Sequence, residues 1–164
     1  MATASTNLSN YDKTKLPESK DFKIGLVVSE WNNQITEGLY QGAFEAFTDC
    51  GVLKQNIIRW DVPGSFELIY GAKRMQQVKP ELDAIVVIGC VIEGETKHFD
   101  FVCQGVTAGV KDLNIQGAIP VIFCVLTDHN MQQSIDRSGG KHGNKGTEAA
   151  IAAIKMAQLK KLEN

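Results

Sequence analysis

The chain has little of what directs a protein to nucleic acid or to a membrane. Its 164 residues hold 17 basic and 19 acidic side chains, and this net charge of −2 offers no excess for binding a polyanion. The apolar runs, such as residues 84–90, are much shorter than the roughly 20 residues of a spanning helix. The first 20 residues are polar and do not match an export signal. We therefore expect a cytoplasmic protein that binds small molecules, without nucleic-acid or membrane partners.

Cysteine and histidine are few and scattered. The cysteines form no Cys-x-x-Cys pair, and three of them lie in apolar runs, where cysteine behaves as a small hydrophobic residue. The histidines lack the spacing of zinc ligands. We therefore expect reduced, buried cysteines and no bound metal. The residues concerned are Cys50, Cys90, Cys103, Cys124, His98, His129 and His142.

Short apolar runs alternate with segments of helical periodicity. This alternation favours an α/β fold, and we expect a flavodoxin-like three-layer αβα sandwich with a four-stranded parallel sheet of order 2-1-3-4. Residues 1–20 are expected to form a flexible N-terminal arm, and residues 21–164 a single domain. The expected strands are 23–29, 56–62, 82–90 and 120–126, and the expected helices are 33–50, 66–77, 98–115, 131–137 and 147–162.

In such sheets, ligands bind beyond the carboxyl ends of the strands, near the point where the strand order reverses. Trp31 follows the first expected strand, where its ring can either pack in the core, the commoner role, or stack on a flat substrate. Ser65 follows the second strand, just before Glu67. Its hydroxyl can cap the next helix, the simpler interpretation, or join free backbone N–H groups in binding a polar molecule.

The segment after the third expected strand is typical of a phosphate site. A turn flanked by glycines leads into a helix, with Thr96 as the expected cap. Because the charge of Glu95 opposes an anion, we expect backbone groups of this turn to make the contact. His98, at the start of the helix, can transfer protons near neutral pH, although a single histidine is more often structural or merely exposed.

A glycine-rich loop near the carboxyl end carries Arg137, Lys141 and Lys145. Such a loop is usually a solvated surface, but its cations also suit phosphate, which arginine can hold with two hydrogen bonds. Lys145 is followed by glycine and then threonine, which is the wrong order for a Walker loop. Nucleotide hydrolysis is therefore not expected.

Taken in order, these segments resemble the lumazine synthase family, and the match runs from about residue 22 to residue 162. The motifs are Glu30-Trp31-Asn32, Val62-Pro63-Gly64-Ser65-Phe66-Glu67-Leu68, Gly89-x-Val91-Ile92-x-Gly94-x-Thr96-x-His98-Phe99, Pro120-Val121-Ile122-Phe123, and Arg137 followed by Gly143-Asn144-Lys145-Gly146. Any one motif can arise by chance, whereas five in register are highly specific.

The resemblance implies condensation of 5-amino-6-(ribitylamino)uracil with 3,4-dihydroxy-2-butanone 4-phosphate, which gives 6,7-dimethyl-8-ribityllumazine, phosphate and water without a cofactor. It makes His98 the proton-transfer residue. It assigns contacts with phosphate to Glu95, Thr96 and Arg137. It assigns contacts with the pyrimidinedione and its ribityl chain to Trp31, Gly64, Ser65, Phe66, Glu67, Cys90, Val91, Ile92, Phe123 and Lys145. Glu93 and Glu95 depart from the family pattern, in which the first position is often basic or neutral and the second is usually small.

The resemblance also implies a homo-oligomer whose active sites lie between adjacent subunits. Phe123 and Arg137 would come from a neighbouring subunit of a pentamer, and the short turn 137–145 favours an icosahedral capsid of twelve pentamers. Riboflavin synthase is a candidate partner. Two alternatives stay open at this point, namely a non-catalytic flavin- or lumazine-binding module of the same fold and a capsid-forming shell protein that has lost its activity. Such a loss is disfavoured by the presence of Trp31, Glu67, His98 and Arg137.

Overall fold

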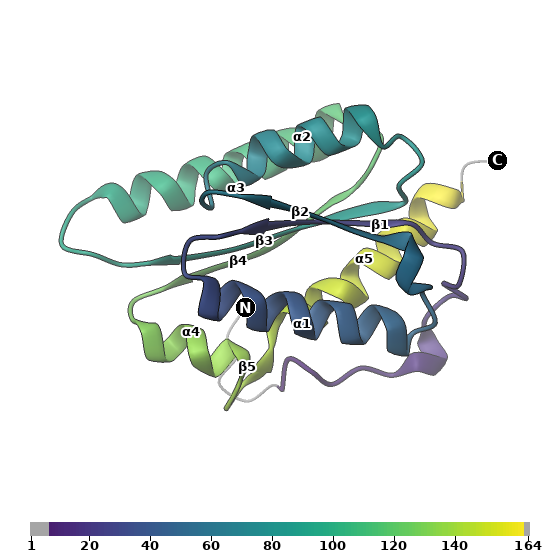
Figure 1. The fold of residues 1–164 in the computed structure, drawn as a ribbon, viewed down its shortest axis with the longest axis horizontal. Helices are drawn as coiled ribbons and strands as arrows, with labels where there is room; N and C mark the ends of the chain where they lie inside the picture. Colours follow the sequence, from purple (N-terminus) through teal and green to yellow (C-terminus); the bar gives the residue numbers. More distant parts are fainter. Residues whose placement is uncertain (1–6, 163–164) are drawn as a thin grey trace.

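The computed structural model describes residues 7–162 and shows a parallel sheet between two layers of helices (Figure 1). The sheet order is β2-β1-β3-β4, as the sequence predicted. The strands of this sheet are β1 (Ile24–Ser29), β2 (Ile57–Val62), β3 (Ala84–Ile92) and β4 (Val121–Asp128). The α-helices are α1 (Asn33–Asp49), α2 (Leu68–Val78), α3 (His98–Gln116), α4 (Met131–Arg137) and α5 (Lys145–Lys161). Two 3-10 turns, η1 (Lys13–Lys15) and η2 (Lys54–Asn56), precede β1 and β2.

The two faces of the sheet bury separate cores. Along β1, Leu26 and Val28 pack with α1 and α5, whereas Val27 packs with α2 and α3 on the opposite face. This alternation arises because successive side chains of a strand point to opposite faces. Both faces are covered, so every residue of β1 is buried. The central strands are thereby fixed, and their carboxyl ends are held at one edge of the sheet.

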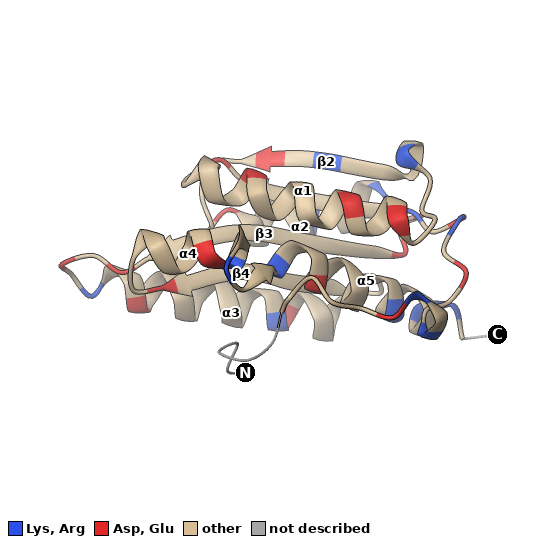
Figure 2. Ribbon diagram, turned by 90° about the horizontal axis from the view of Figure 1, so that it is seen from below, with Lys and Arg blue, Asp and Glu red and all other residues tan. Residues whose placement is uncertain are grey.

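The carboxyl end of α5 is bonded to the opposite end of the sheet, where the strands begin. Lys160 donates a hydrogen bond of 2.5 Å to the carbonyl oxygen of Leu82, and Lys161 lies 3.3 Å from the carboxylate of Asp83. Figure 2 shows basic residues near the end of α5 and acidic residues along α1. These contacts anchor the last helix at the end of the sheet that lies away from the strand carboxyl ends.

The predicted elements are all present, but several boundaries differ. Strand β3 continues to Ile92 and β4 to Asp128, because each pairs with the other to its end. Helix α2 begins at Leu68, two residues later than predicted. The glycine-rich segment predicted as an open loop contains a small antiparallel hairpin of β5 (Ser138–Gly140) and β6 (Gly143–Asn144).

The described part of the N-terminal segment lies against the domain. Leu8 is buried and its N–H group donates to the carbonyl oxygen of His142, and Lys13 lies 2.5 Å from the carboxylate of Asp49 on α1. The buried Ser19 donates to the carbonyl oxygen of Cys50. Residues 1–6 of the predicted arm lie outside the described residues. The division into a flexible arm and one domain stays a prediction, since contacts in one conformation do not measure motion.

The prediction that all the cysteines are buried was only half correct. All four are free thiols, but only Cys90 and Cys124 are buried, whereas Cys50 and Cys103 are half-buried. The half-buried pair lies at the end of α1 and on the outer side of α3, where solvent reaches one side of each helix. Within residues 7–162, no helix is both long and apolar enough to cross a membrane.

Candidate functional site

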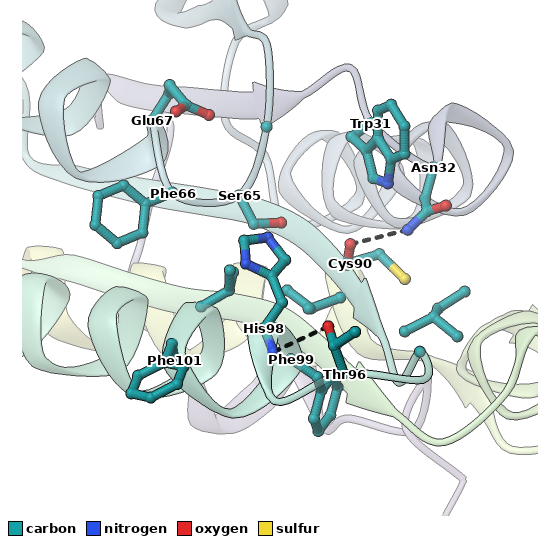
Figure 3. A pocket seen from close by; sticks show the side chains of 15 residues that line it. Trp31, Asn32, Ser65, Phe66, Glu67, Cys90, Thr96, His98, Phe99 and Phe101 are labelled. Atoms are coloured by element: carbon teal, nitrogen blue, oxygen red, sulfur yellow. Dashed lines mark hydrogen bonds between the residues drawn. The ribbon is translucent and has the colours of Figure 1, made fainter.

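A cavity of about 690 Å³ opens at the carboxyl ends of β1 and β3 (Figure 3). Strand β1 pairs with β2 on one side and with β3 on the other, so the strand order reverses here, as the sequence analysis required. The predicted contact residues that line this cavity are Trp31, Gly64, Ser65, Phe66, Glu67, Cys90, Val91, Ile92, Thr96 and His98. They come from four separate stretches of chain.

The turn after β1 presents Trp31 to solvent. Its side chain is 72% exposed, so the core position that is commoner for tryptophan does not apply. The backbone of the turn stays hydrogen-bonded to the end of β2 and the residue after it. The N–H of Glu30 donates to the carbonyl of Val62 at 2.8 Å, and the N–H of Trp31 donates to the carbonyl of Pro63 at 3.2 Å. The ring is therefore available on one wall of the cavity as a surface for stacking.

Asn32 fixes this turn in a way that the sequence analysis did not foresee. It stands at the N-cap position of α1, but its side chain makes no capping hydrogen bond. The side-chain amide instead donates to the carbonyl oxygen of Cys90 on β3 at 3.0 Å. Asn32 therefore does not cap α1 with its side chain, since the contact with β3 takes that side chain away from the helix start.

The turn between β2 and α2 places a polar group without a partner inside the cavity wall. Ser65 is 7% exposed, and its Oγ has no hydrogen-bond partner among the described residues. Ser65 does not cap α2, which begins at Leu68 without a side-chain capping bond. The turn can approach β3 closely because residue 89 is glycine: a Cβ there would lie 2.7 Å from the Oγ of Ser65. A buried hydroxyl of this kind is costly unless a ligand satisfies it.

Phe66 and Glu67 extend the wall toward α3 and α2. The ring of Phe66 is 53% exposed and lies on Gly105 of α3, where an added Cβ would come within 2.7 Å of it. Glu67 is exposed, and its carboxylate lies beside Gly64 of the same turn. This wall therefore combines an apolar ring with a carboxylate that can accept hydrogen bonds.

Cys90 lies at the base of the cavity and is 1% exposed. Burial raises the pKa of its thiol above the usual value, with the nearby carboxylate of Asp128 adding to the effect. The S–H group donates to the Oγ of the buried Ser134 at 3.4 Å. A neutral thiol that is already hydrogen-bonded is a poor nucleophile, so the geometry makes Cys90 part of the floor rather than an attacking group.

The loop from Glu93 to Lys97 leads into α3, which begins at His98. The Oγ1 of Thr96 accepts a hydrogen bond of 3.4 Å from the N–H of His98. The expected cap was wrong, because the helix begins at His98, and Lys97, not Thr96, occupies the N-cap position. Lys97 makes no side-chain capping bond, so backbone N–H groups at the start of this 19-residue helix remain available to an anion. The side chain of Glu93 pairs with His129 at the end of β4, and Glu95 does not line the cavity.

Besides Glu95, three predicted site residues are not brought to this cavity within the chain. Phe123 lies on the edge strand β4, with 37% of its surface exposed. Arg137 donates to the carbonyl oxygen of Gln133 at 2.9 Å, and Lys145 lies 2.6 Å from the carboxylate of Glu148. Their roles stay predictions.

The cavity also has lining residues to which the sequence analysis gave no role. These are Asn32, Gly94, Phe99, Phe101 and Val102. Phe101 is 71% exposed, and it follows His98 by three positions on the same face of α3. An aromatic residue at that spacing from a proposed site residue is the signal that could have found it.

Comparisons with known proteins identify the family to which this chain is similar. The sequence model of the family described as 6,7-dimethyl-8-ribityllumazine synthase matches residues 21–161. A protein of that name from Flavobacterium johnsoniae is 73% identical over 98% of this chain and 84% of its own length. One from Christiangramia forsetii is 71% identical over 98% of this chain and 96% of its own. One from Porphyromonas gingivalis is 52% identical over 99% of this chain and 100% of its own.

Proposed function

Because the chain belongs to the 6,7-dimethyl-8-ribityllumazine synthase family of riboflavin-biosynthesis enzymes, we propose that its cavity condenses 5-amino-6-(ribitylamino)uracil with 3,4-dihydroxy-2-butanone 4-phosphate. The products are 6,7-dimethyl-8-ribityllumazine, phosphate and two molecules of water. The observation that carries the proposal is the shared cavity of Trp31, Ser65 and His98. It joins an exposed aromatic ring, a buried hydroxyl without a partner and a group that can move protons.

The pyrimidinedione fits the wall formed by Trp31. A flat heterocycle gains from stacking on an exposed indole, and backbone groups of Val91 and Ile92 at the end of β3 can meet its polar edge. The ribityl chain is a row of hydroxyls, which can both donate and accept hydrogen bonds. Ser65 and Glu67 offer it a hydroxyl and a carboxylate on one side of the cavity.

The phosphate of the second substrate fits the start of α3. Free N–H groups and the positive end of the helix dipole favour an anion there, and contacts through the backbone of Glu95 and Thr96 avoid the carboxylate of Glu95. Arg137 supplies the opposing cation. Because Arg137 lies outside the cavity of its own chain, we propose that it reaches the cavity of an adjacent subunit together with Phe123, and with Lys145 nearby.

The chemistry requires proton movement rather than a strong nucleophile. The 5-amino group attacks the ketone and loses water to form an imine, phosphate is then eliminated, and the ribitylamino nitrogen closes the ring with loss of a second water. His98 lies where it can exchange protons with these groups. Positioning of two substrates can supply up to about 7–11 kcal/mol, and an acid–base group about 10²–10⁴-fold, so positioning is the larger contribution. No step removes electrons, so a redox cofactor has no part in it.

The proposal includes an assembly. A pentamer would complete each cavity with residues from a neighbour, and we favour twelve pentamers in an icosahedral capsid because the turn 137–145 is short. Sedimentation velocity tests the capsid, and a species no larger than a pentamer contradicts it. A cytoplasmic location, consistent with four free thiols, and riboflavin synthase as a partner complete the proposal.

The direct test mixes the purified protein with both substrates. We expect lumazine fluorescence to appear together with one phosphate per product molecule, and neither signal when one substrate is omitted. Tight retention of the pyrimidinedione without turnover contradicts the proposal and favours the non-catalytic binding module.

A further inference from the structure

We propose that Asp128 is a positioning residue for Arg137, whose guanidinium it holds so that one edge stays open to phosphate. The inference rests on the proposed function, since it concerns the residue assigned there to phosphate. Asp128 is the last residue of β4, and its side chain is only 10% exposed. A carboxylate that is nine-tenths buried needs compensation, and among the described residues Arg137 is its only ion-pair partner.

Two hydrogen bonds define the position of Asp128. The hydroxyl of Ser134, which is fully buried on α4, donates to one carboxylate oxygen at 2.8 Å. The backbone carbonyl of Asp128 accepts the N–H of Glu93 at 3.0 Å, which ties the end of β4 to the start of the loop before α3. The second carboxylate oxygen thus keeps a fixed direction, and it lies 3.9 Å from Nη1 of Arg137.

Arg137 is held by one side of its guanidinium. Nη1 donates to the carbonyl oxygen of Gln133 at 2.9 Å and faces Asp128, whereas Nε and Nη2 have no protein partner among the described residues. The Nε and Nη2 groups form the fork that binds phosphate through two parallel hydrogen bonds. An arginine at the end of a seven-residue helix would otherwise sample many rotamers, and a fixed fork loses less entropy when an anion binds.

The first test is Asp128→Asn, which keeps the size of the side chain and an oxygen for Ser134 but removes the charge that faces Arg137. We expect the KM for the keto-phosphate to rise about tenfold, which is the scale of restoring rotamer freedom to one long side chain. The KM for the pyrimidinedione and kcat should stay within about twofold, because the positioning acts only on the phosphate contact. Inorganic phosphate should also become a weaker competitor of the keto-phosphate.

Asp136→Asn is the matched control. It removes a carboxylate from the same helix, one residue before Arg137. The Asp136 carboxylate accepts a hydrogen bond from the amide of Gln132 and does not pair with the guanidinium. Its kinetic constants should match those of the unmodified protein. If Asp128→Asn does not fold, Ser134→Ala carries the test, because it frees the Asp128 carboxylate and should raise the same KM by a smaller factor.

A double-mutant cycle separates positioning through Arg137 from an independent effect. In an Arg137→Ala background, Asp128→Asn should cause no further rise in the keto-phosphate KM. An equal rise in both backgrounds overturns the proposal, as does an unchanged or lower KM in Asp128→Asn alone. A lower KM would mean that the carboxylate competes with phosphate for the guanidinium. If the unmodified protein makes no lumazine, it is the proposed function that fails.

Discussion

The side-chain amide of Asn32 donates a hydrogen bond of 3.0 Å to the carbonyl oxygen of Cys90, and so joins the turn after β1 to the strand at the base of the cavity. Asn32 adopts a left-handed conformation with φ of 58°, the only described non-glycine residue with a positive φ. Asparagine tolerates this conformation better than most residues. Its neighbour Trp31 therefore keeps its place at the cavity wall through a bond made 58 residues away in the chain.

Two replacements of Asn32 should separate the contribution of its hydrogen bond to stability from that of its left-handed backbone conformation. Asn32→Ala loses the bond to Cys90 and puts alanine, which tolerates the left-handed region less well than asparagine, at this position, so we expect the free energy of unfolding to fall by about 2 kcal/mol. Asn32→Gly loses only the bond and should be about 1 kcal/mol more stable than the alanine variant. Urea unfolding measures both.

Both Asn32 variants should also raise the KM for the pyrimidinedione, because the turn that carries Trp31 loses its tie to β3. Equal stabilities for the two variants, or an unchanged KM in both, would show that this turn is held by other contacts.

The buried hydroxyl of Ser65 should behave as a ligand contact rather than as a structural one. Since its Oγ has no partner within residues 7–162, Ser65→Ala should leave the free energy of unfolding unchanged or raise it slightly. The KM for the pyrimidinedione should rise about 2–10-fold, which corresponds to the loss of one hydrogen bond to the ribityl chain. Thermal unfolding and steady-state kinetics on the same preparation provide the two values. A less stable variant with an unchanged KM would make the hydroxyl structural.

The buried thiol of Cys124 should make the fold sensitive to alkaline pH. Burial raises its pKa from 9.0 to about 12. A raised pKa in the fold means that the stabilising contribution is complete below pH 9 and is lost as the pH rises toward 12. At pH 11 the loss should reach about 2–3 kcal/mol, since each unit of pKa difference corresponds to about 1.4 kcal/mol.

Cys124→Ala should remove most of this alkaline loss in urea unfolding between pH 8 and pH 11. Cys103→Ala, which removes a half-buried thiol, serves as the control and should change the slope less. If the unmodified protein and the Cys124→Ala variant lose stability in parallel, a group other than Cys124 titrates.

The sequence alone was enough for the sheet order and for most of the cavity wall. Strands that alternate with helices leave few arrangements, and the carboxyl ends of such strands meet at one edge. Trp31, Ser65 and His98 each lie in the connection that follows a strand or at its end, so their convergence could be predicted without knowledge of any contact. The buried runs of β1 and β3 made this possible, because they are almost entirely apolar.

Local sequence patterns gave wrong predictions where a residue distant in the chain determines the conformation of a side chain or the end of a strand. Asn32 and Ser65 both stand where a helix cap is expected, yet one bonds to Cys90 on β3 and the other turns into the cavity. The fourth strand was predicted to end at Leu126, whereas it continues to Asp128. A buried carboxylate at the end of a strand is stable only with partners, and these are Ser134 and Arg137, which follow later in the chain. Periodicity along the chain carries no information on such compensation between elements.

The claim that each site is shared between subunits is tested most directly by mixing two defective chains. Arg137→Ala should mainly weaken binding of the keto-phosphate, whereas His98→Ala should slow turnover and leave partial activity. The two variants are co-expressed with different tags, the mixed oligomers are purified, and turnover is measured at low keto-phosphate concentration.

If His98 and Arg137 of one site come from neighbouring chains, a random one-to-one mixture restores about a quarter of the sites, since each partner is native half of the time. Turnover should then clearly exceed that of either variant alone. Turnover that equals the average of the two variants would show that both residues serve the site from the same chain, or that they do not share a site.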